Sequence, residues 1–261
     1  MRLSHGLRMT DFEPRIDRPI RDSRCGGRHF WVLGGMLVIA IGAALPRASA
    51  ASEPETPEAQ WRVLTQQYTR EYKLQHYQEA AEAARRAVEA AALAFGPDDP
   101  KTAQTLNDLG HLHQRLGEYE QAQRLHRRSL EIRQRRFGAE DPEVAQSLVN
   151  LAKADHELGQ YSDAEALFSR ALLILEKQSS MQQPQVAEIL GYLARGHSRA
   201  GEDQLAEPFF QRAVSTAIRM PPLAYPGADR LIEEYAACLD RLGKAEKAAA
   251  VRKRTDPLFT P

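Results

Sequence analysis

The chain contains four prolines, Pro100, Pro142, Pro184 and Pro226, that lie 42 residues apart. A fixed period of this length is typical of solenoid proteins, in which each repeat is one helical hairpin that cannot bury its apolar face alone. Apolar and small residues recur at the same place in every period, at the spacings of three and four that mark one side of a helix. The pattern therefore predicts an all-α solenoid of antiparallel helix-turn-helix units, and it argues against an enzyme.

Each period divides into two helices at a glycine, because glycine adopts the left-handed conformation that ends a helix. An upstream unit follows the same pattern but carries Gln75 at the turn. The turn glycines are Gly117, Gly159, Gly201 and Gly243. The stripe expected on the second helix has three rows: Ala122, Ala164, Ala206 and Ala248, then Leu125, Leu167, Phe209 and Val251, and finally Leu130, Leu172 and Val214. Five hairpins, with about ten helices, are predicted over 59–100, 101–142, 143–184, 185–226 and 227–254.

These residues resemble tetratricopeptide repeats of the 42-residue kind found in kinesin light chains. The parallel is clearest in FGPDDPKTAQTLNDLGHLHQRLGEYEQAQRLHRRSLEIRQRRFG, residues 95–138, and it covers about 200 of the 261 residues. That family usually carries a histidine before the linker proline, where this chain has Asp99, Asp141, Gln183 and Tyr225. The resemblance implies a helical solenoid that serves as a scaffold, and such repeats bind many unrelated partners.

The resemblance also implies where a partner binds, since ligands of tetratricopeptide folds lie along the concave surface formed by the first helices. Basic side chains outnumber acidic ones there, which favours an acidic extended segment or a free carboxylate. Asparagines would hold the peptide backbone and cations would pair with its charges. A polar face without a ligand is the alternative. The candidate peptide-binding residues are Asn107, His111, Arg115, Asn150, Lys153, His156, Arg195 and Arg199.

The N-terminal part has the features of a secretory signal peptide, 1–50. Residues 30–45 form an uncharged apolar run that follows basic residues and precedes the small-residue pattern Ala48-Ser49-Ala50. We expect cleavage after Ala50 and an exported, periplasmic protein. The run is shorter than the roughly 20 residues of a membrane span, and an uncleaved anchor is the alternative. Residues 51–58 are predicted to be a flexible tether, followed by the solenoid at 59–254 and a tail at 255–261.

Few residues suggest bond chemistry or metal binding. His111 and His113 are two apart and point to different sides of a helix, while His126 and His156 lie in separate repeats. We expect surface or groove histidines, no metal and no cofactor. Cys238 is expected to be a buried small hydrophobic residue. The arginine-rich helix is expected to be a solvated face rather than a lipid or nucleic-acid patch; its arginines are Arg124, Arg127, Arg128, Arg133, Arg135 and Arg136.

The whole chain has 35 basic and 35 acidic residues, so its net charge gives no general attraction to nucleic acid. The function that the sequence favours is a non-enzymatic exported scaffold that binds a partner protein or an acidic extended peptide. The alternative is a structural subunit that self-assembles or docks into a cell-envelope complex through the last repeat and the tail 255–261.

Overall fold

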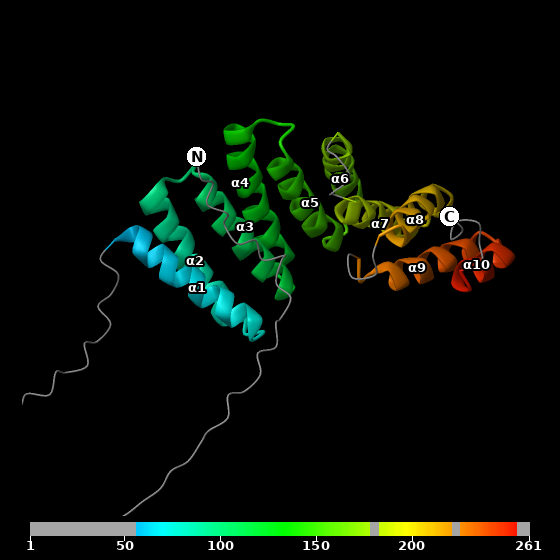
Figure 1. Ribbon diagram of the computed structural model, residues 1–261, viewed down its shortest axis with the longest axis horizontal. Helices are drawn as coiled ribbons and strands as arrows, with labels where there is room; N and C mark the ends of the chain where they lie inside the picture. The colour runs from blue at the N-terminus through cyan, green and yellow to red at the C-terminus, as the bar shows by residue number, and fades with distance from the viewer. Residues whose placement is uncertain (1–55, 178–182, 221–224, 255–261) are drawn as a thin grey trace, which may run out of the picture. The chain divides into compact units, whose positions relative to one another are not determined.

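The computed structural model describes residues 56–177, 183–220 and 225–254, which belong to one compact unit (Figure 1). The predicted signal peptide 1–50 and the tail 255–261 lie outside the described residues. No helix in the described ranges is long and apolar enough to cross a membrane. The described ranges contain ten helices and no strand: α1 (Pro57–Lys73), α2 (Tyr77–Phe95), α3 (Pro100–Arg115), α4 (Tyr119–Phe137), α5 (Pro142–Glu157), α6 (Tyr161–Glu176), α7 (Gln183–Arg199), α8 (Asp203–Ile218), α9 (Ala228–Arg241) and α10 (Ala245–Arg252).

Consecutive helices pair into five hairpins, α1 with α2 through α9 with α10, and each hairpin packs on the next (Figure 1). The predicted all-α solenoid is confirmed. Small side chains at the hairpin contacts, such as Ala103, Ala145 and Ala187, are fully buried and let neighbouring helices approach closely. The repeat therefore exists in the structure as one supersecondary unit stacked in series.

Two of the four linker residues that stand in place of the family's histidine, Asp99 and Asp141, act as helix N-caps. The Asp99 carboxylate accepts a hydrogen bond from the backbone N–H of Lys101 at 2.8 Å, and the Asp141 carboxylate accepts one from Glu143 at 2.8 Å. Each aspartate precedes a proline at the first helical position, where a missing N–H costs no intrahelical bond. The cap and the proline together set where α3 and α5 begin.

The four prolines do not all stand at the same position relative to the start of a helix. Pro184 is the second residue of α7, and Pro226 lies two residues before α9. At the other end, α1 begins at Pro57, two residues before the expected start of the solenoid, with the Thr56 hydroxyl accepting from the backbone N–H of Ala59. The last two residues of the expected tether are therefore helical.

The hairpin turns use a left-handed residue after the first helix, as predicted. The φ angles are 77° at Gly117 and at Gly159, 81° at Gly201 and 73° at Gly243. Gln75 occupies the same place in the first hairpin with φ 63°. A residue with a Cβ is strained there, because the Cβ approaches the following carbonyl oxygen. The first turn is thus the strained member of an otherwise regular series.

Changing Gln75→Gly is expected to stabilise the domain by about 0.5–1 kcal/mol. The change relieves the left-handed strain, and this gain is partly offset because glycine makes the unfolded chain more flexible. Urea unfolding followed by circular dichroism measures the change. The reciprocal variant Gly117→Ala is expected to destabilise the domain by a similar free energy. Open space surrounds that glycine, so only the strain in its backbone conformation matters. A lower midpoint for Gln75→Gly would contradict this account.

The second helices bury a different column from the one that the sequence predicted. His126, Phe168 and Phe210 are 0–1% exposed, whereas the expected Leu125, Leu167 and Phe209 are only partly buried. Each second helix contacts both its own first helix and the next hairpin, so its apolar stripe is broad, and the neighbouring column points to the centre of that stripe. One row of the expected stripe was therefore one residue out of register in α4, α6 and α8. The other rows, with Ala122, Leu130 and their counterparts, are buried as expected, and so is Val251 in α10.

Candidate functional site

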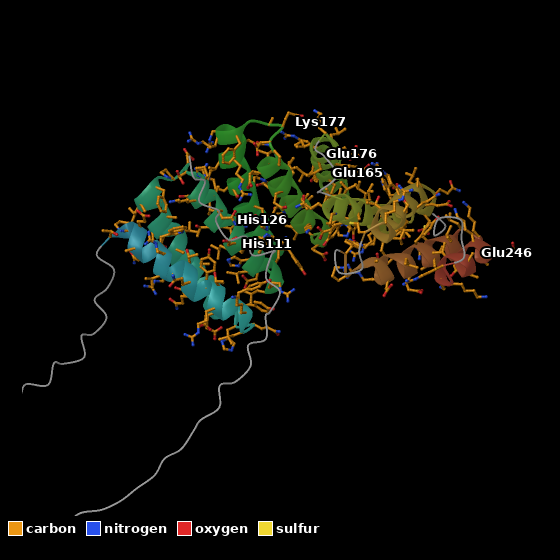
Figure 2. All side chains as sticks on the ribbon, viewed as in Figure 1. His111, His126, Glu165, Glu176, Lys177 and Glu246 are labelled. Carbon is orange, nitrogen blue, oxygen red and sulfur yellow. The ribbon has the colours of Figure 1, made fainter. Side chains whose placement is uncertain are left out.

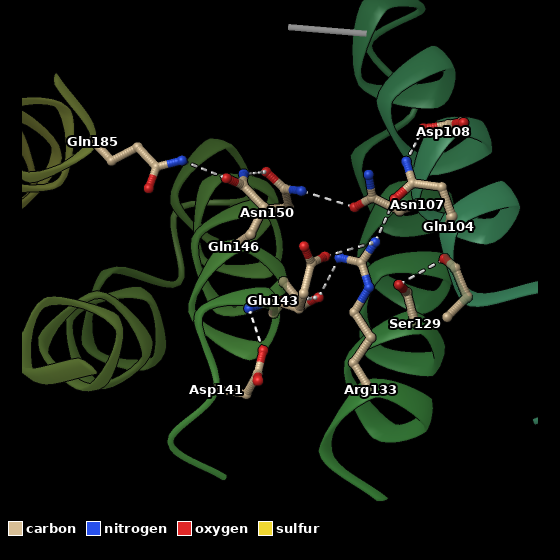
Figure 3. Close-up of polar contacts among 12 residues, drawn as sticks. Gln104, Asn107, Asp108, Ser129, Arg133, Asp141, Glu143, Gln146, Asn150 and Gln185 are labelled. Atoms are coloured by element: carbon tan, nitrogen blue, oxygen red, sulfur yellow. Dashed lines mark hydrogen bonds and ion pairs between the residues drawn. The ribbon is translucent and has the colours of Figure 1, made fainter. Parts of the chain in front are cut away.

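A chain of side-chain amides links three successive first helices (Figure 3). Gln185 on α7 donates to the Gln146 Oε1 on α5 at 2.6 Å, and Gln146 donates to Asn150 Oδ1 at 3.2 Å. Asn150 in turn donates to Asn107 Oδ1 on α3 at 2.7 Å. We call the side of α3, α5 and α7 that carries this amide chain, with its continuation onto α9, the first-helix face. Asn107 and Asn150 are buried within it, whereas Gln146 and Gln185 are partly exposed.

Two of the predicted cations on this face are paired with carboxylates of the following hairpin. Lys153 Nζ lies 2.7 Å from Glu188 Oε1, and Arg195 donates to Glu234 Oε2 at 3.0 Å. Arg195 also lies over the ring of Tyr192, 4.3 Å from its centroid. These contacts neutralise both cations and connect α5 with α7 and α7 with α9.

The other two predicted cations have neutral partners. Arg115 donates to the Tyr77 hydroxyl at 2.8 Å, and Arg199 donates to His156 Nε2 at 3.1 Å. Burial lowers the pKa of His156 to about 4, so its ring is neutral at pH 7 and can accept that hydrogen bond. Arg115 and Arg199 are exposed, and their positive charge is not cancelled by the group that they contact.

His126 is not the surface or groove histidine that the sequence suggested. Its ring is fully buried, and neither ring nitrogen has a hydrogen-bond partner in the described part of the chain. The ring fills the space above Gly110, where an added Cβ would lie 2.6 Å from His126 Cε1. The partly buried ring of His111 lies 5.1 Å away, as labelled in Figure 2. Burial lowers the pKa of both histidines, that of His111 to about 4.

The sequence contained a signal for this burial. His126 stands at the position of Phe168 and Phe210, and Gly110 stands where the third, fourth and fifth repeats have alanine. The imidazole and the glycine substitute together for an aromatic ring and a methyl group.

Arg133 departs from the solvated helix face predicted for α4. It is 3% exposed and donates to Ser147 Oγ at 2.8 Å and to Gln104 Oε1 at 2.5 Å, with Glu143 at 3.9 Å (Figure 3). A guanidinium can be buried here because acceptors from both neighbouring first helices, α3 and α5, surround it. Arg124, Arg127, Arg135 and Arg136 are exposed as expected.

The network around Arg133 continues into the first hairpin. Gln104 donates to Asp108 Oδ1 at 2.8 Å, and Tyr68 on α1 donates to Asp108 Oδ2 at 2.9 Å. Burial raises the pKa of Asp108 to about 6, although both hydrogen bonds favour its charged form. Buried, mutually bonded polar groups hold four helices, α1, α3, α4 and α5, in one arrangement beneath the first-helix face.

A cavity of about 320 Å³ lies where the third and fourth hairpins meet. Its walls come from the end of α5, from α6, from α7 and from the turn between α7 and α8. Gly196 faces it from α7, at the position that Leu112, Ala154 and Cys238 occupy in the other first helices. The missing side chain at Gly196 leaves room that the other hairpin contacts fill.

Cys238 is fully buried, as expected, and burial raises the pKa of its thiol to about 12. In the described ranges, histidine, cysteine and acidic side chains form no group of three or more that could hold a metal ion.

Five helical hairpins joined by polar contacts between neighbouring repeats define an α-solenoid repeat protein. The tetratricopeptide repeat family matches residues 71–135, 107–177 and 143–219, which together span more than half of the sequence. The chain belongs to the tetratricopeptide repeat family, a fold that typically serves as a non-enzymatic protein-interaction scaffold, and the predicted resemblance is confirmed.

Solved structures support the same fold. A putative kinesin light chain from Podosopora anserina with nearly identical TPR-like repeats is 20% identical, covers 78% of this chain and 96% of its own, and has a TM-score of 0.62. BtubC from P. vanneervenii is 20% identical over 77% of this chain and 82% of its own, with a TM-score of 0.66. Aspartyl phosphate phosphatase F from Bacillus subtilis is 17% identical over 77% of this chain and 51% of its own, with a TM-score of 0.65. No curated protein sequence matches significantly.

Proposed function

We propose that this protein is a non-enzymatic, exported scaffold that binds an extended segment of a partner protein on the first-helix face. The observation that carries the proposal is the amide chain that runs from α7 through α5 to α3. Side-chain amides offer both donors and acceptors, which an extended peptide backbone needs along its length. The partly exposed Gln146 and Gln185 would contact the segment, and the buried Asn107 and Asn150 would hold those glutamines in position.

The charge preference of this face depends on Arg115 and Arg199. Lys153 and Arg195 already have carboxylate partners, so an acidic segment would have to displace Glu188 or Glu234 to reach them. Arg115 and Arg199 contact neutral groups, and a carboxylate gains more there. Both are exposed, so each contact is worth only about 1 kcal/mol or less. We therefore expect a modest preference for acidic segments, centred on these two arginines.

The double variant Arg115→Gln/Arg199→Gln is expected to lower the affinity for acidic synthetic peptides about tenfold, because two contacts of this size disappear. Fluorescence anisotropy with a set of labelled acidic and charge-neutral peptides measures the change. The matched variant Lys153→Gln/Arg195→Gln removes the same charge from the same face but should have the smaller effect. If the second variant loses as much binding as the first, or neither loses any, the assignment is overturned.

Export of the protein is tested by the mass of its mature N-terminus. The apolar run 30–45 and the pattern Ala48-Ser49-Ala50 support cleavage, with the mature chain starting at Ala51. A membrane-bound chain that retains 30–45 would instead support the anchored alternative.

Self-assembly through the last hairpin has weaker support. In the described part of the chain, the exposed large hydrophobic side chains lie at Val63, Leu74, Leu93, Phe137, Leu173 and Leu205, and none is on α9 or α10. Light scattering of the protein with and without 255–261 tests the alternative, which requires the oligomer to depend on that tail.

A further inference from the structure

The cavity between the third and fourth hairpins is lined on the α7 side by Gly196, which has no side chain. Leu112 fills the corresponding position in α3, Ala154 in α5 and Cys238 in α9, and all three are fully buried. At Gly196 the helix has no side chain, and the nearest atom to an added Cβ is His156 Nδ1 at 3.9 Å, an ordinary contact distance. A Cβ would therefore fit there, and the absence of a side chain at Gly196 adds free space at this hairpin contact.

Aromatic rings form much of the cavity wall. Tyr192 stacks on Phe168 with ring centroids 5.2 Å apart, and His156 meets both Tyr161 and Tyr192 edge-on at 5.2 Å. Because the rings pack against one another, their orientations are set before any ligand enters. Arg195 already lies over the Tyr192 ring, 4.3 Å from its centroid. An incoming cation is therefore expected against Tyr161 or Phe168, which also line the cavity, and a preorganised set of rings loses little entropy on binding.

Two carboxylates complete the wall on the α6 and α8 sides. His197 Nδ1 lies 2.9 Å from Glu202 Oε2, and His197 Nε2 lies 3.6 Å from Glu165 Oε1. One imidazole cannot neutralise two carboxylates, whether or not it is protonated, so this side of the cavity keeps a negative charge. Both glutamates remain about half exposed, at 48% and 52% for the side chains, and can reach a ligand at the cavity mouth.

A buried donor also faces the cavity. His156 is 2% exposed and accepts the hydrogen bond from Arg199 at Nε2, which leaves its ring proton at Nδ1. Nδ1 faces Gly196 and has no hydrogen-bond partner within the described residues. This N–H can donate to a backbone carbonyl of a bound segment, while the rings and carboxylates receive a side chain from that segment.

We propose that this cavity binds one basic side chain, arginine or lysine, of the partner protein's segment. A guanidinium can stack on the rings and donate to Glu165 and Glu202 at once, so arginine is expected to bind more tightly than lysine. The inference rests on the proposed function and adds to it the identity of an anchoring side chain. Since Arg199 contacts His156 in the cavity wall, the expected segment has an acidic residue near its basic anchor.

The cavity can be tested without knowing the partner. Titration of the protein with N-acetyl-arginine amide, followed by the ¹⁵N–¹H signal of Gly196, is expected to give a saturable shift that weakens at high salt, because the attraction is electrostatic. The probes for comparison are the N-acetyl amides of phenylalanine and glutamate. The proposal is overturned if Gly196 does not respond to the arginine probe, or if the phenylalanine probe binds more tightly.

Variants then assign the binding to this cavity. Gly196→Leu is expected to abolish the arginine response while the melting temperature holds or rises, because glycine inside a helix is unfavourable. Gly196→Ala adds a smaller side chain to the cavity and is the variant to measure if Gly196→Leu does not fold. Glu165→Gln/Glu202→Gln is expected to weaken the arginine probe about tenfold, the loss of two charge contacts. Glu157→Gln, an exposed carboxylate on α5 outside the cavity wall, is the matched control and should change nothing.

Failure of this inference can be told apart from failure of the proposed function. Capped amino acids test the cavity alone, whereas the peptides above test the first-helix face through Arg115 and Arg199. Acidic peptides that bind while the arginine probe does not would overturn the cavity assignment and leave the scaffold function standing. Segments from a true partner should contain a basic residue whose replacement by glutamine weakens binding to the wild type but not to Gly196→Leu.

Discussion

Replacing His126→Phe is expected to raise the free energy of unfolding by about 1–3 kcal/mol at pH 7, the usual cost of a buried polar group without a partner. The imidazole is fully buried and neither nitrogen is bonded in the described residues. Phenylalanine fits, since Phe168 and Phe210 occupy the same position in the next two repeats. Chemical unfolding monitored by circular dichroism measures the gain.

The advantage of His126→Phe should grow in acid. Burial holds the pKa of His126 well below its ordinary value, so the folded protein keeps the ring neutral while the unfolded chain takes up a proton below about pH 6.5. The stability that depends on a neutral ring is therefore present above that pH and is lost as the pH falls. Between pH 7 and pH 5 the gap between variant and wild type should widen by up to about 2 kcal/mol.

Three other groups titrate in this range and must be separated from His126. His111 and His156 act in the same direction, since the pKa of each is also lowered, to about 4. Asp108 acts in the opposite direction, because its raised pKa of about 6 makes the folded state the stronger proton binder there. All three groups are present in the variant and the wild type, so their effects largely cancel in the difference. His76→Phe, at an exposed histidine, is the control, and a gap for His126→Phe that stays constant with pH would reject the buried-imidazole account.

The second large effect is expected at Arg133. Arg133→Ala should destabilise the domain by about 3 kcal/mol, because it removes a buried charged donor and leaves Gln104 and Ser147 without it. Arg133→Lys is not expected to restore the stability, since a single ammonium cannot match the planar guanidinium that bridges α3 and α5. The unfolding midpoint in urea reports both changes.

Arg135→Ala provides the matched control two residues away on the same helix. Arg135 is exposed and pairs with Asp98, a contact worth about 0–1 kcal/mol. If Arg133→Ala and Arg135→Ala destabilise the protein equally, Arg133 does not hold the hairpins together in the way described.

Much of the scaffold could be predicted because it repeats. The alanines at hairpin contacts and the left-handed turn glycines recur at a fixed step, and stacking places the same demand on each repeat. On the second helices, the most deeply buried residue of each repeat was predicted one position too early. Two adjacent positions are apolar in the repeat, and only the packing shows which of them is fully buried. His126 was missed because a single histidine at that position reads as polar, although its neighbours in register are phenylalanines.

The candidate face was predicted in outline but not in its contacts. Asn107 and Asn150 are 43 residues apart and bond directly, while Lys153 and Glu188 are 35 apart, so neither pair follows the 42-residue step. The offset depends on how one hairpin rotates against the next and on how far each side chain reaches. Alignment on the repeat therefore identifies which side chains share a face, but not which of them bond to one another.

The sequence by itself determined the solenoid, its hairpin turns and the family, because these arise from local periodicity and from residues that any stacked repeat needs. Only the tertiary structure decided that Lys153 and Arg195 are neutralised, that Arg115 and Arg199 are not, and that Gly196 lines a cavity. The physical reason is that charge balance and free volume belong to the contact between two repeats, and that contact forms only when residues distant in the chain are packed together.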